Sequence, residues 1–479
     1  MRNQSIVDYL RGQGLKVIEE DIESKIDLWN SWYIGEVNSV HNYNVYEGKK
    51  KIPVKLKSLK MGARVCQDWA DLLLNERVQI TCADEYTQSV LARLIKQSNF
   101  YVRGNNLIET AFAKGGGFFV EYWDGSKTSI KYLTQDLCYP ISYDGSRLTE
   151  VAFASKKTIA GKKYTYLETH LIDPQTGYYV IDNVLLSSDG KRLKEVDESF
   201  YEEHNLIPKV ITQSTEPLFQ MIRPNVANKE DFDSVFGTSV FADALDVLEC
   251  VDIAYDAHPR EIRLGKKRLF AKDSVTNVHI NPETGEETRV FDANDEAFYL
   301  IKGDTEDGTP PIIECNMSLR IAELNLELQT QLDILSQKCG FGNNYYRWDS
   351  GSITTATEVI STNSKMFRTL KKHELVLNDA IVTMARGLLY TEALFTGDKR
   401  IKYDESITVD FDDSIIEDTA EIKRQASSEY AMGIISQTEY VKKVYKYDDE
   451  QASNFIKKMK EQRAAELASE PIQNEPEGA

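Results

Sequence analysis

The residues with the clearest potential for chemistry are three acids at the end of a predicted strand, Asp410, Asp412 and Asp413. Carboxylate oxygens are the ligands that Mg²⁺ prefers, so this cluster is compatible with a metal-dependent nuclease. Acids between a strand and a helix are also typical caps, because a carboxylate accepts hydrogen bonds from the first helical turn. We favour the capping role and keep a Mg²⁺-dependent DNA-processing enzyme as the alternative.

Other reactive residue types lack the spacing that catalysis or metal binding requires. The six histidines form no HExxH or HxxxH pair, and the six cysteines form no CxxC pair, which predicts neither a zinc site nor a disulfide framework. The sequence has no GxSxG, Walker A or GxGxxG motif, so no standard nucleophile or nucleotide site is indicated. We expect no catalytic residue, no metal and no cofactor.

Composition and charge narrow the class of protein further. With 479 residues, 41% hydrophobic and 28% charged, the chain should fold into roughly two to four packed domains. A net charge of -19 argues against a protein that holds nucleic acid by neutralising phosphates, although a channel in which DNA slides remains compatible. No apolar run is long enough for a membrane span or a signal peptide, which predicts a cytosolic protein with no membrane contact.

The first 226 residues predict helices followed by an antiparallel β meander. One apolar stripe indicates an N-terminal helix (Met61, Val65, Trp69, Leu72), and a second helix is expected at Glu85–Gln97. From about Gly117 to Ser188, short runs rich in Tyr, Val, Ile and Thr are separated by turn residues. Two Asp-Gly pairs, at 124–125 and 144–145, are typical of hairpin turns.

A helix predicted from Thr238 or Ser239 to His258 has an unusual charge distribution. Its acids share one half of the helical wheel and no base accompanies them: Asp243, Asp246, Glu249, Asp252 and Asp256. Such a helix gains no support from ion pairs between neighbouring turns. Two interpretations stay open, a solvated face and the like-charged lining of a pore.

A small β insertion follows from about Lys267 to Leu300, with a hairpin turn expected at Pro282 to Gly285. A basic cluster precedes it, composed of Arg260, Arg263, Lys266, Lys267 and Arg268. This cluster suits either a docking surface for an acidic partner or a solvated helix end.

A long helix is predicted from Ser318 to Gln337, with two apolar stripes. The first stripe holds Met317, Ile321, Leu324, Leu328, Leu332 and Leu335, and the second holds Leu319 and Leu326. Two apolar faces require neighbours on two sides. Equivalent helices standing side by side in a ring meet this requirement, and so does a helix buried within one domain.

An aromatic loop follows, from Gly340 to Ile353, and leads into a long helix that starts at Thr354 or Thr355. A short strand pair is expected next, in the runs RIKYDES and ITVDF. The C-terminal part predicts a helix at Asp418–Met432, a capping box from Ser436 to Glu439, a last helix to about Leu467, and a disordered tail.

Three stretches together resemble the portal proteins of tailed bacteriophages, especially those of long-tailed phages of Gram-positive hosts. They are FGTSVFADALDVLECVDIAYD running into REIRLGKKRLF, then GSITTATEVISTNSKMFRTLKKHE, and finally EIKRQASSEYAMGIISQTEYV. The resemblance covers nearly the whole chain in order. It implies an α+β, mainly helical portal fold with long stem helices, a β-rich wing and a small β clip, assembled as a ring.

The resemblance also implies a division of the chain. The expected parts are a wing (1–226), a stem helix (227–266), a clip (267–311), a second stem helix (312–339), a tunnel loop (340–353), a long helix with a short β pair (354–414), crown helices (415–467) and a tail (468–479).

In function, the resemblance implies a dodecameric ring at one capsid vertex, through which double-stranded DNA is packaged and ejected. The tunnel-loop residues Tyr345, Tyr346, Arg347 and Trp348 would contact DNA, and the acidic stem face would line the channel. Terminase and later the head-completion adaptor would dock on the clip, while the major capsid and scaffolding proteins would contact the wing. The ring would assemble in the host cytoplasm and remain in the virion; another head or neck component is a further alternative.

Overall fold

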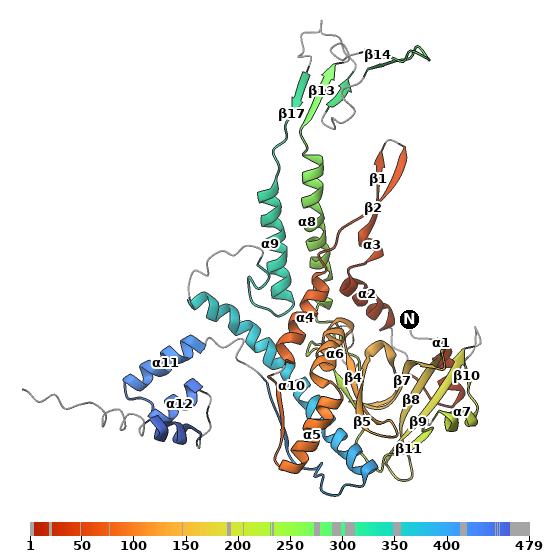
Figure 1. Cartoon of the computed structure of the whole chain (residues 1–479), viewed down its shortest axis with the longest axis vertical. Helices are drawn as coiled ribbons and strands as arrows, with labels where there is room; N and C mark the ends of the chain where they lie inside the picture. The colour runs from red at the N-terminus through yellow and green to blue at the C-terminus, as the bar shows by residue number, and fades with distance from the viewer. Residues whose placement is uncertain are drawn as a thin grey trace, which may run out of the picture.

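The structure is a computed structural model in which an α and β body carries a projecting two-helix stem with a small β region at its far end (Figure 1). This architecture confirms the predicted α+β class. The structure describes residues 4–18, 22–47, 49–75, 77–145, 147–188, 193–204, 206–229, 231, 234–272, 278–289, 298–301, 312–347, 356–411, 419–445, 447, 449 and 451–459. None of the helices in these ranges is long and apolar enough to cross a membrane.

The N-terminal part is mainly helical. Its elements are α1 (Gln4–Gly12), α2 (Glu23–Ile34), α3 (Asn38–His41), β1 (Asn42–Glu47), β2 (Lys50–Lys55), α4 (Met61–Leu73), β3 (Gln79–Cys82), α5 (Glu85–Gln97) and α6 (Phe100–Lys114). The two predicted helices are present as α4 and α5. Helix α5 begins where predicted because the Asp84 carboxylate accepts a hydrogen bond from the Thr87 N–H at 3.0 Å.

Two antiparallel sheets follow, and they contain the predicted meander. The first has the order β12-β4-β5, formed by β4 (Gly117–Trp123), β5 (Thr128–Thr134) and β12 (Phe219–Ile222). The second has the order β10-β9-β8-β7-β6 with β11 on β9, formed by β6 (Cys138–Asp144), β7 (Arg147–Ile159), β8 (Lys162–Ile172), β9 (Tyr179–Ser188), β10 (Leu193–Glu195) and β11 (Lys209–Ile211). Short helical elements η1 (Gln135–Leu137) and α7 (Glu198–Glu203) connect these strands.

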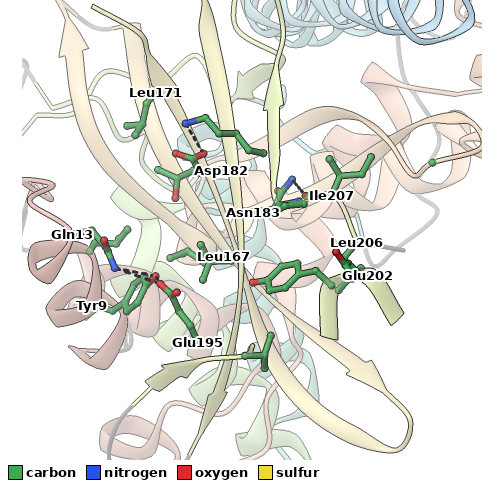
Figure 2. Close-up of a pocket in the computed structure, with 18 of the residues that line it drawn as sticks. Tyr9, Gln13, Leu167, Leu171, Asp182, Asn183, Glu195, Glu202, Leu206 and Ile207 are labelled. Carbon is green, nitrogen blue, oxygen red and sulfur yellow. Dashed lines mark hydrogen bonds and ion pairs between the residues drawn. The ribbon is translucent and has the colours of Figure 1, made fainter. Parts of the chain in front are cut away.

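Helix α1 closes one face of the second sheet. Ile6, Val7 and Leu10 are buried against Leu167 and Leu186 of the sheet in a small apolar cluster of their own. At the rim of the groove between α1 and the sheet, the Tyr9 hydroxyl donates to the Glu195 carboxylate (Figure 2). The N-terminal helix is therefore a fixed part of the wing region.

Helix α10 (Ala356–Thr396) crosses the body (Figure 1) and contributes buried side chains to the main apolar core. It packs on β4 and β12, and its apolar side chains Ile381, Met384 and Leu388 are fully buried. Near its C-terminal end, Glu392 accepts hydrogen bonds from Arg93 and from Thr128, both at 2.6 Å. These contacts tie α10 to α5 and to the first sheet.

The predicted strand pair after α10 is wrong. The strand β18 (Ile407–Asp410) pairs with β3, not with residues 400–406. The segment before β18 is instead held in a turn, where Arg400 and Asp398 form an ion pair of 2.8 Å and Lys402 contacts Asp84 at 2.7 Å. Asp412 and Asp413 lie outside the described residues.

The C-terminal helices are α11 (Thr419–Ala431) and α12 (Gln437–Tyr445), and residues 451–459 are also helical. The predicted capping box is confirmed. The Glu439 N–H donates to the Ser436 hydroxyl oxygen at 3.1 Å, and the Ser436 N–H donates to the Glu439 carboxylate at 3.1 Å. Gly433 takes a positive φ of 71° between the two helices.

One buried imidazole makes stability depend on pH. His373 of α10 is 2% exposed and packs against Trp69 and Phe112, with ring centroids 4.9 and 5.0 Å away. Its Nδ1 accepts a hydrogen bond from the Asn225 N–H at 3.0 Å. Burial lowers the pKa of His373 to about 3, because an apolar environment disfavours the charged ring.

We expect the protein to lose stability as the pH falls from about 6.5 toward 3, because only the unfolded chain then takes up the His373 proton. The free energy of unfolding should fall by up to about 1.4 kcal/mol per pH unit from this group. Urea unfolding at several pH values should give a smaller dependence for His373→Gln than for the wild type. The partly exposed His204, changed to Gln, is the control; equal slopes in all three proteins would contradict the prediction.

Candidate functional site

The stem consists of two helices that lie side by side, α8 (Leu245–Leu264) and α9 (Ile321–Lys338), preceded by the short η2 (Ala242–Ala244) (Figure 1). Helix α8 starts later than predicted because Val240 donates its N–H to the Phe112 carbonyl oxygen at 2.9 Å, outside any helical turn. It also continues past His258, its predicted end, through Pro259 to Leu264.

Two ion pairs fasten α8 to α9 at opposite ends of the stem. At the base, Lys338 contacts the Asp246 carboxylate at 3.1 Å. At the far end, Arg320 forms two side-chain hydrogen bonds with the Glu261 carboxylate, of 2.8 and 3.2 Å. The Arg320 guanidinium lowers the pKa of Glu261 to about 2. The pairing at both ends fixes the register of the two helices.

The acidic face of α8 differs from the prediction. Asp243 and Asp246 are exposed but pair with Lys229 and Lys338, and Glu249 is partly exposed. Asp252 and Asp256 are 3% and 6% exposed. The channel-lining role predicted for these last two residues is wrong, because the segment after β2 covers their side of the helix.

Asp252 and Asp256 instead anchor this segment to the stem. Asp252 accepts hydrogen bonds from the Leu59 N–H at 2.7 Å and from His41 Nε2 at 3.0 Å. The proton is on Nε2, because the other ring nitrogen of His41 accepts the Val37 N–H. Asp256 accepts the Lys57 N–H at 3.2 Å. Burial raises the pKa of Asp252, and the hydrogen bonds oppose that shift.

The clip region is a three-stranded sheet with a separate hairpin. Strand β13 (Arg268–Lys272) is central, parallel to β16 (Phe298–Ile301) and antiparallel to β17 (Ile312–Cys315). The predicted turn is present between β14 (Val278–Ile280) and β15 (Glu287–Arg289), where the Gly285 N–H donates to the Asn281 carbonyl oxygen at 2.9 Å. Strand β17 lies beyond residue 311, the predicted end of the clip, so the β region at the end of the stem extends to Cys315.

Several members of the basic cluster before the clip contact other side chains. Arg260 contacts the Tyr43 hydroxyl, and Lys267 pairs with Glu314. Arg268 lies 6.0 Å from the centre of the Tyr299 ring. Arg263 and Lys266 are exposed near the end of α8. The cluster therefore spans the junction of stem and clip.

The first half of the predicted tunnel loop packs against the body. Phe341 is fully buried and stacks between Trp69 and Tyr345, with ring centroids 4.4 and 4.3 Å away. The Tyr346 carbonyl oxygen accepts a hydrogen bond from Gln329 at 3.0 Å.

This packing leaves Tyr346 partly buried and Tyr345 37% exposed, whereas Arg347 is exposed. Tyr346 is thus unavailable for the predicted stacking on DNA, because its ring packs beside Phe341. Trp348 and residues 349–353 lie outside the described residues.

A second basic segment was not predicted to have a role. It follows β1 and contains six exposed lysines, Lys49, Lys50, Lys51, Lys55, Lys57 and Lys60. The run GKKKIPVKLKSLK contains six lysines and no acid, whereas the cluster before the clip contains five bases and Glu261, so a count of charge along the chain would have found it. In the described part of the chain, no group of three or more His, Cys, Asp or Glu side chains is arranged to hold a metal ion.

Comparison with known proteins gives one family match. Residues 334–467 match the family model described as "Phage portal protein, SPP1 Gp6-like". The match starts near the end of α9 and includes the tunnel loop, α10 and the C-terminal helices. No curated protein matches the chain.

Two solved structures contain distantly similar chains. One is titled "Virion of native gene transfer agent (GTA) particle", with 12% identity, coverage of 91% of this chain and 96% of the other, and a TM-score of 0.47. The other is titled "Neck of empty GTA particle computed with C6 symmetry", with 11% identity, coverage of 92% and 98%, and a TM-score of 0.45.

The family match confirms two expectations from the sequence. The portal family is structural and not enzymatic, in agreement with the prediction that this chain is not an enzyme. By this match, residues 334–467 of the chain are similar to phage portal proteins, which agrees with the resemblance found in the sequence.

Proposed function

We propose that the chain is the subunit of a dodecameric portal ring at one capsid vertex, through which double-stranded DNA is packaged and ejected. The family match over residues 334–467 carries this proposal. The two-helix stem ending in a β clip supports it, because a ring of such stems would enclose an axial channel. The ring would assemble in the host cytoplasm and remain in the virion.

Exposed apolar side chains along the stem support assembly. They occur on both helices and beside them: Ile253 (50% exposed), Ile262 (57%), Leu264 (60%), Met317 (66%), Leu319 (45%) and Leu326 (70%). Leu319 and Leu326 form the second stripe predicted from the sequence. Apolar side chains gathered along one projecting structure are typical of a surface that a partner covers. In a ring, neighbouring copies of the chain would cover them.

We propose a narrower channel-lining role for the stem acids than the sequence predicts. It is limited to Asp243, Asp246 and Glu249, the acids of this face that lie at the surface. The ion pairs of the first two reduce their net charge. A wall with few free cations would let DNA slide, since each Lys or Arg contact with phosphate adds salt-dependent binding.

The other regions take the roles expected of a portal. The clip, with Arg263, Lys266 and Arg268 at its base, would dock the terminase during packaging and the head-completion adaptor afterwards. The body of residues 4–226, the wing, would contact the major capsid and scaffolding proteins. The helices α11 and α12 would form the crown. Because the chain is structural, the energy for DNA movement would come from the terminase.

The first prediction concerns assembly. We expect the purified protein to form rings with an axial hole, visible by negative-stain electron microscopy, because the stem exposes apolar surface that a neighbour must cover. Sedimentation at increasing concentration should give the same assembled mass. A protein that stays monomeric at high concentration would rule out the proposed function.

The second prediction concerns the tunnel loop. We expect Arg347→Ala combined with Trp348→Ala to leave ring assembly intact and to lower the number of DNA-filled heads, because the loop would lose a cationic and an aromatic contact to the moving DNA. The control is Arg147→Ala, which removes an exposed arginine 63% accessible on the distant strand β7. Unchanged packaging in the double variant would mean that the loop does not contact DNA.

A further inference from the structure

The hairpin of β1 and β2 projects beside α8 (Figure 1), and the contacts that the described residues show between them lie near its base. The anchors are the hydrogen bonds of Asp252 and Asp256 to Leu59 and Lys57, and the contact of Tyr43 with Arg260. A two-stranded hairpin has marginal stability on its own in water. Its outer part therefore needs a further packing partner.

The two faces of the hairpin differ in character. The pairing of Tyr43 with Val54 and of Val45 with Ile52 places apolar side chains on one face. On that face Tyr43, Ile52 and Val54 are partly buried. The opposite face carries Asn42, Asn44, Tyr46, Lys51, Pro53 and Lys55, which are all exposed.

This outward face carries two lysines, Lys51 and Lys55, and a large aromatic side chain. Tyr46 is 68% exposed. Within the described residues, Lys55 is the one lysine of residues 49–60 with a carboxylate partner, Glu36 at 3.1 Å. In a chain of net charge -19, a run of six exposed lysines that includes Lys51 and Lys55 of this face favours an acidic surface as the partner of the hairpin.

The outer face of α9 has the complementary character. Opposite the buried Leu328, Leu332 and Leu335, it presents a stripe at helical spacing: Glu323, Leu326, Glu327, Thr330 and Ile334. Leu326 is 70% exposed and Ile334 is 37% exposed. The stripe combines two acids with apolar side chains, which suits a surface containing lysines and a tyrosine.

We propose that the outward face of the hairpin packs on the outer face of α9 in the next copy of the chain. This inference rests on the proposed ring and names the contact that builds it. Helix α8 lies between the hairpin and α9 (Figure 1), so one chain cannot make the contact with itself. A contact between two different surfaces repeats from copy to copy and closes into a ring when the rotation allows.

Charge reversal tests the contact. Lys51→Glu with Lys55→Glu should abolish most of the ring population seen by electron microscopy, and Glu323→Lys with Glu327→Lys should do the same. Combining the four changes should restore rings, because opposite charges then face each other again. The control is Lys162→Glu with Lys163→Glu, the same charge change at exposed positions of β8, which should leave assembly unchanged.

A cysteine pair gives an independent readout. In a Cys250→Ser background, which removes an exposed thiol, Tyr46→Cys and Leu326→Cys together should give a ladder of covalent multimers on oxidation. Each single variant should give none.

Three results would each overturn the proposed contact, and each would lead to a different conclusion. Rings that persist in both charge variants, with no ladder, would leave the proposed ring standing without this interface. If the hairpin variant forms intact rings but no longer binds DNA, the lysines contact nucleic acid and not the next copy of the chain. A monomeric wild type would remove the proposed function and the contact with it.

Discussion

The indole of Trp69 joins the stem to the body of the protein. Its N–H donates to the Cys339 carbonyl oxygen at 3.1 Å, at the point where α9 ends. Its ring stacks on Phe341 and meets the edge of His373 on α10. One buried side chain of α4 thus contacts the stem, the start of the loop and the long helix. The direction in which the stem projects depends on this junction.

The same junction constrains the loop that follows α9. Gly340 takes a positive φ of 88°, and a Cβ at this position would lie 2.6 Å from the Thr369 side chain. The chain can therefore turn back against α10 only with glycine here. This turn brings Phe341 under Trp69 and holds the following tyrosines close to the body. In the described part of the loop, Asn343, Tyr345 and Arg347 remain exposed.

The acids of the stem mainly form ion pairs and hydrogen bonds that join elements of the fold. Asp246 and Glu261 join α8 to α9, while Asp252 and Asp256 hold the segment after β2. Buried carboxylates are stable here because each accepts main-chain or side-chain hydrogen bonds. Together with buried apolar side chains of both helices, such as Leu248 and Val251 of α8 and Leu328 of α9, these polar contacts set the register of the stem. The apolar side chains that stay exposed on the stem are available for contacts with other copies of the chain.

Local features of this protein were determined by the sequence itself. Asp84 starts α5, the Ser436 to Glu439 box starts α12, and Asp-Gly pairs turn the meander, because each signal acts over a few residues. Only the tertiary structure decided which distant groups meet. Strand β18 pairs with β3, β17 completes the clip sheet, and Asp252 is buried by Leu59. Helical periodicity marks a charged face, but whether that face meets water or another segment depends on packing between residues far apart in the chain.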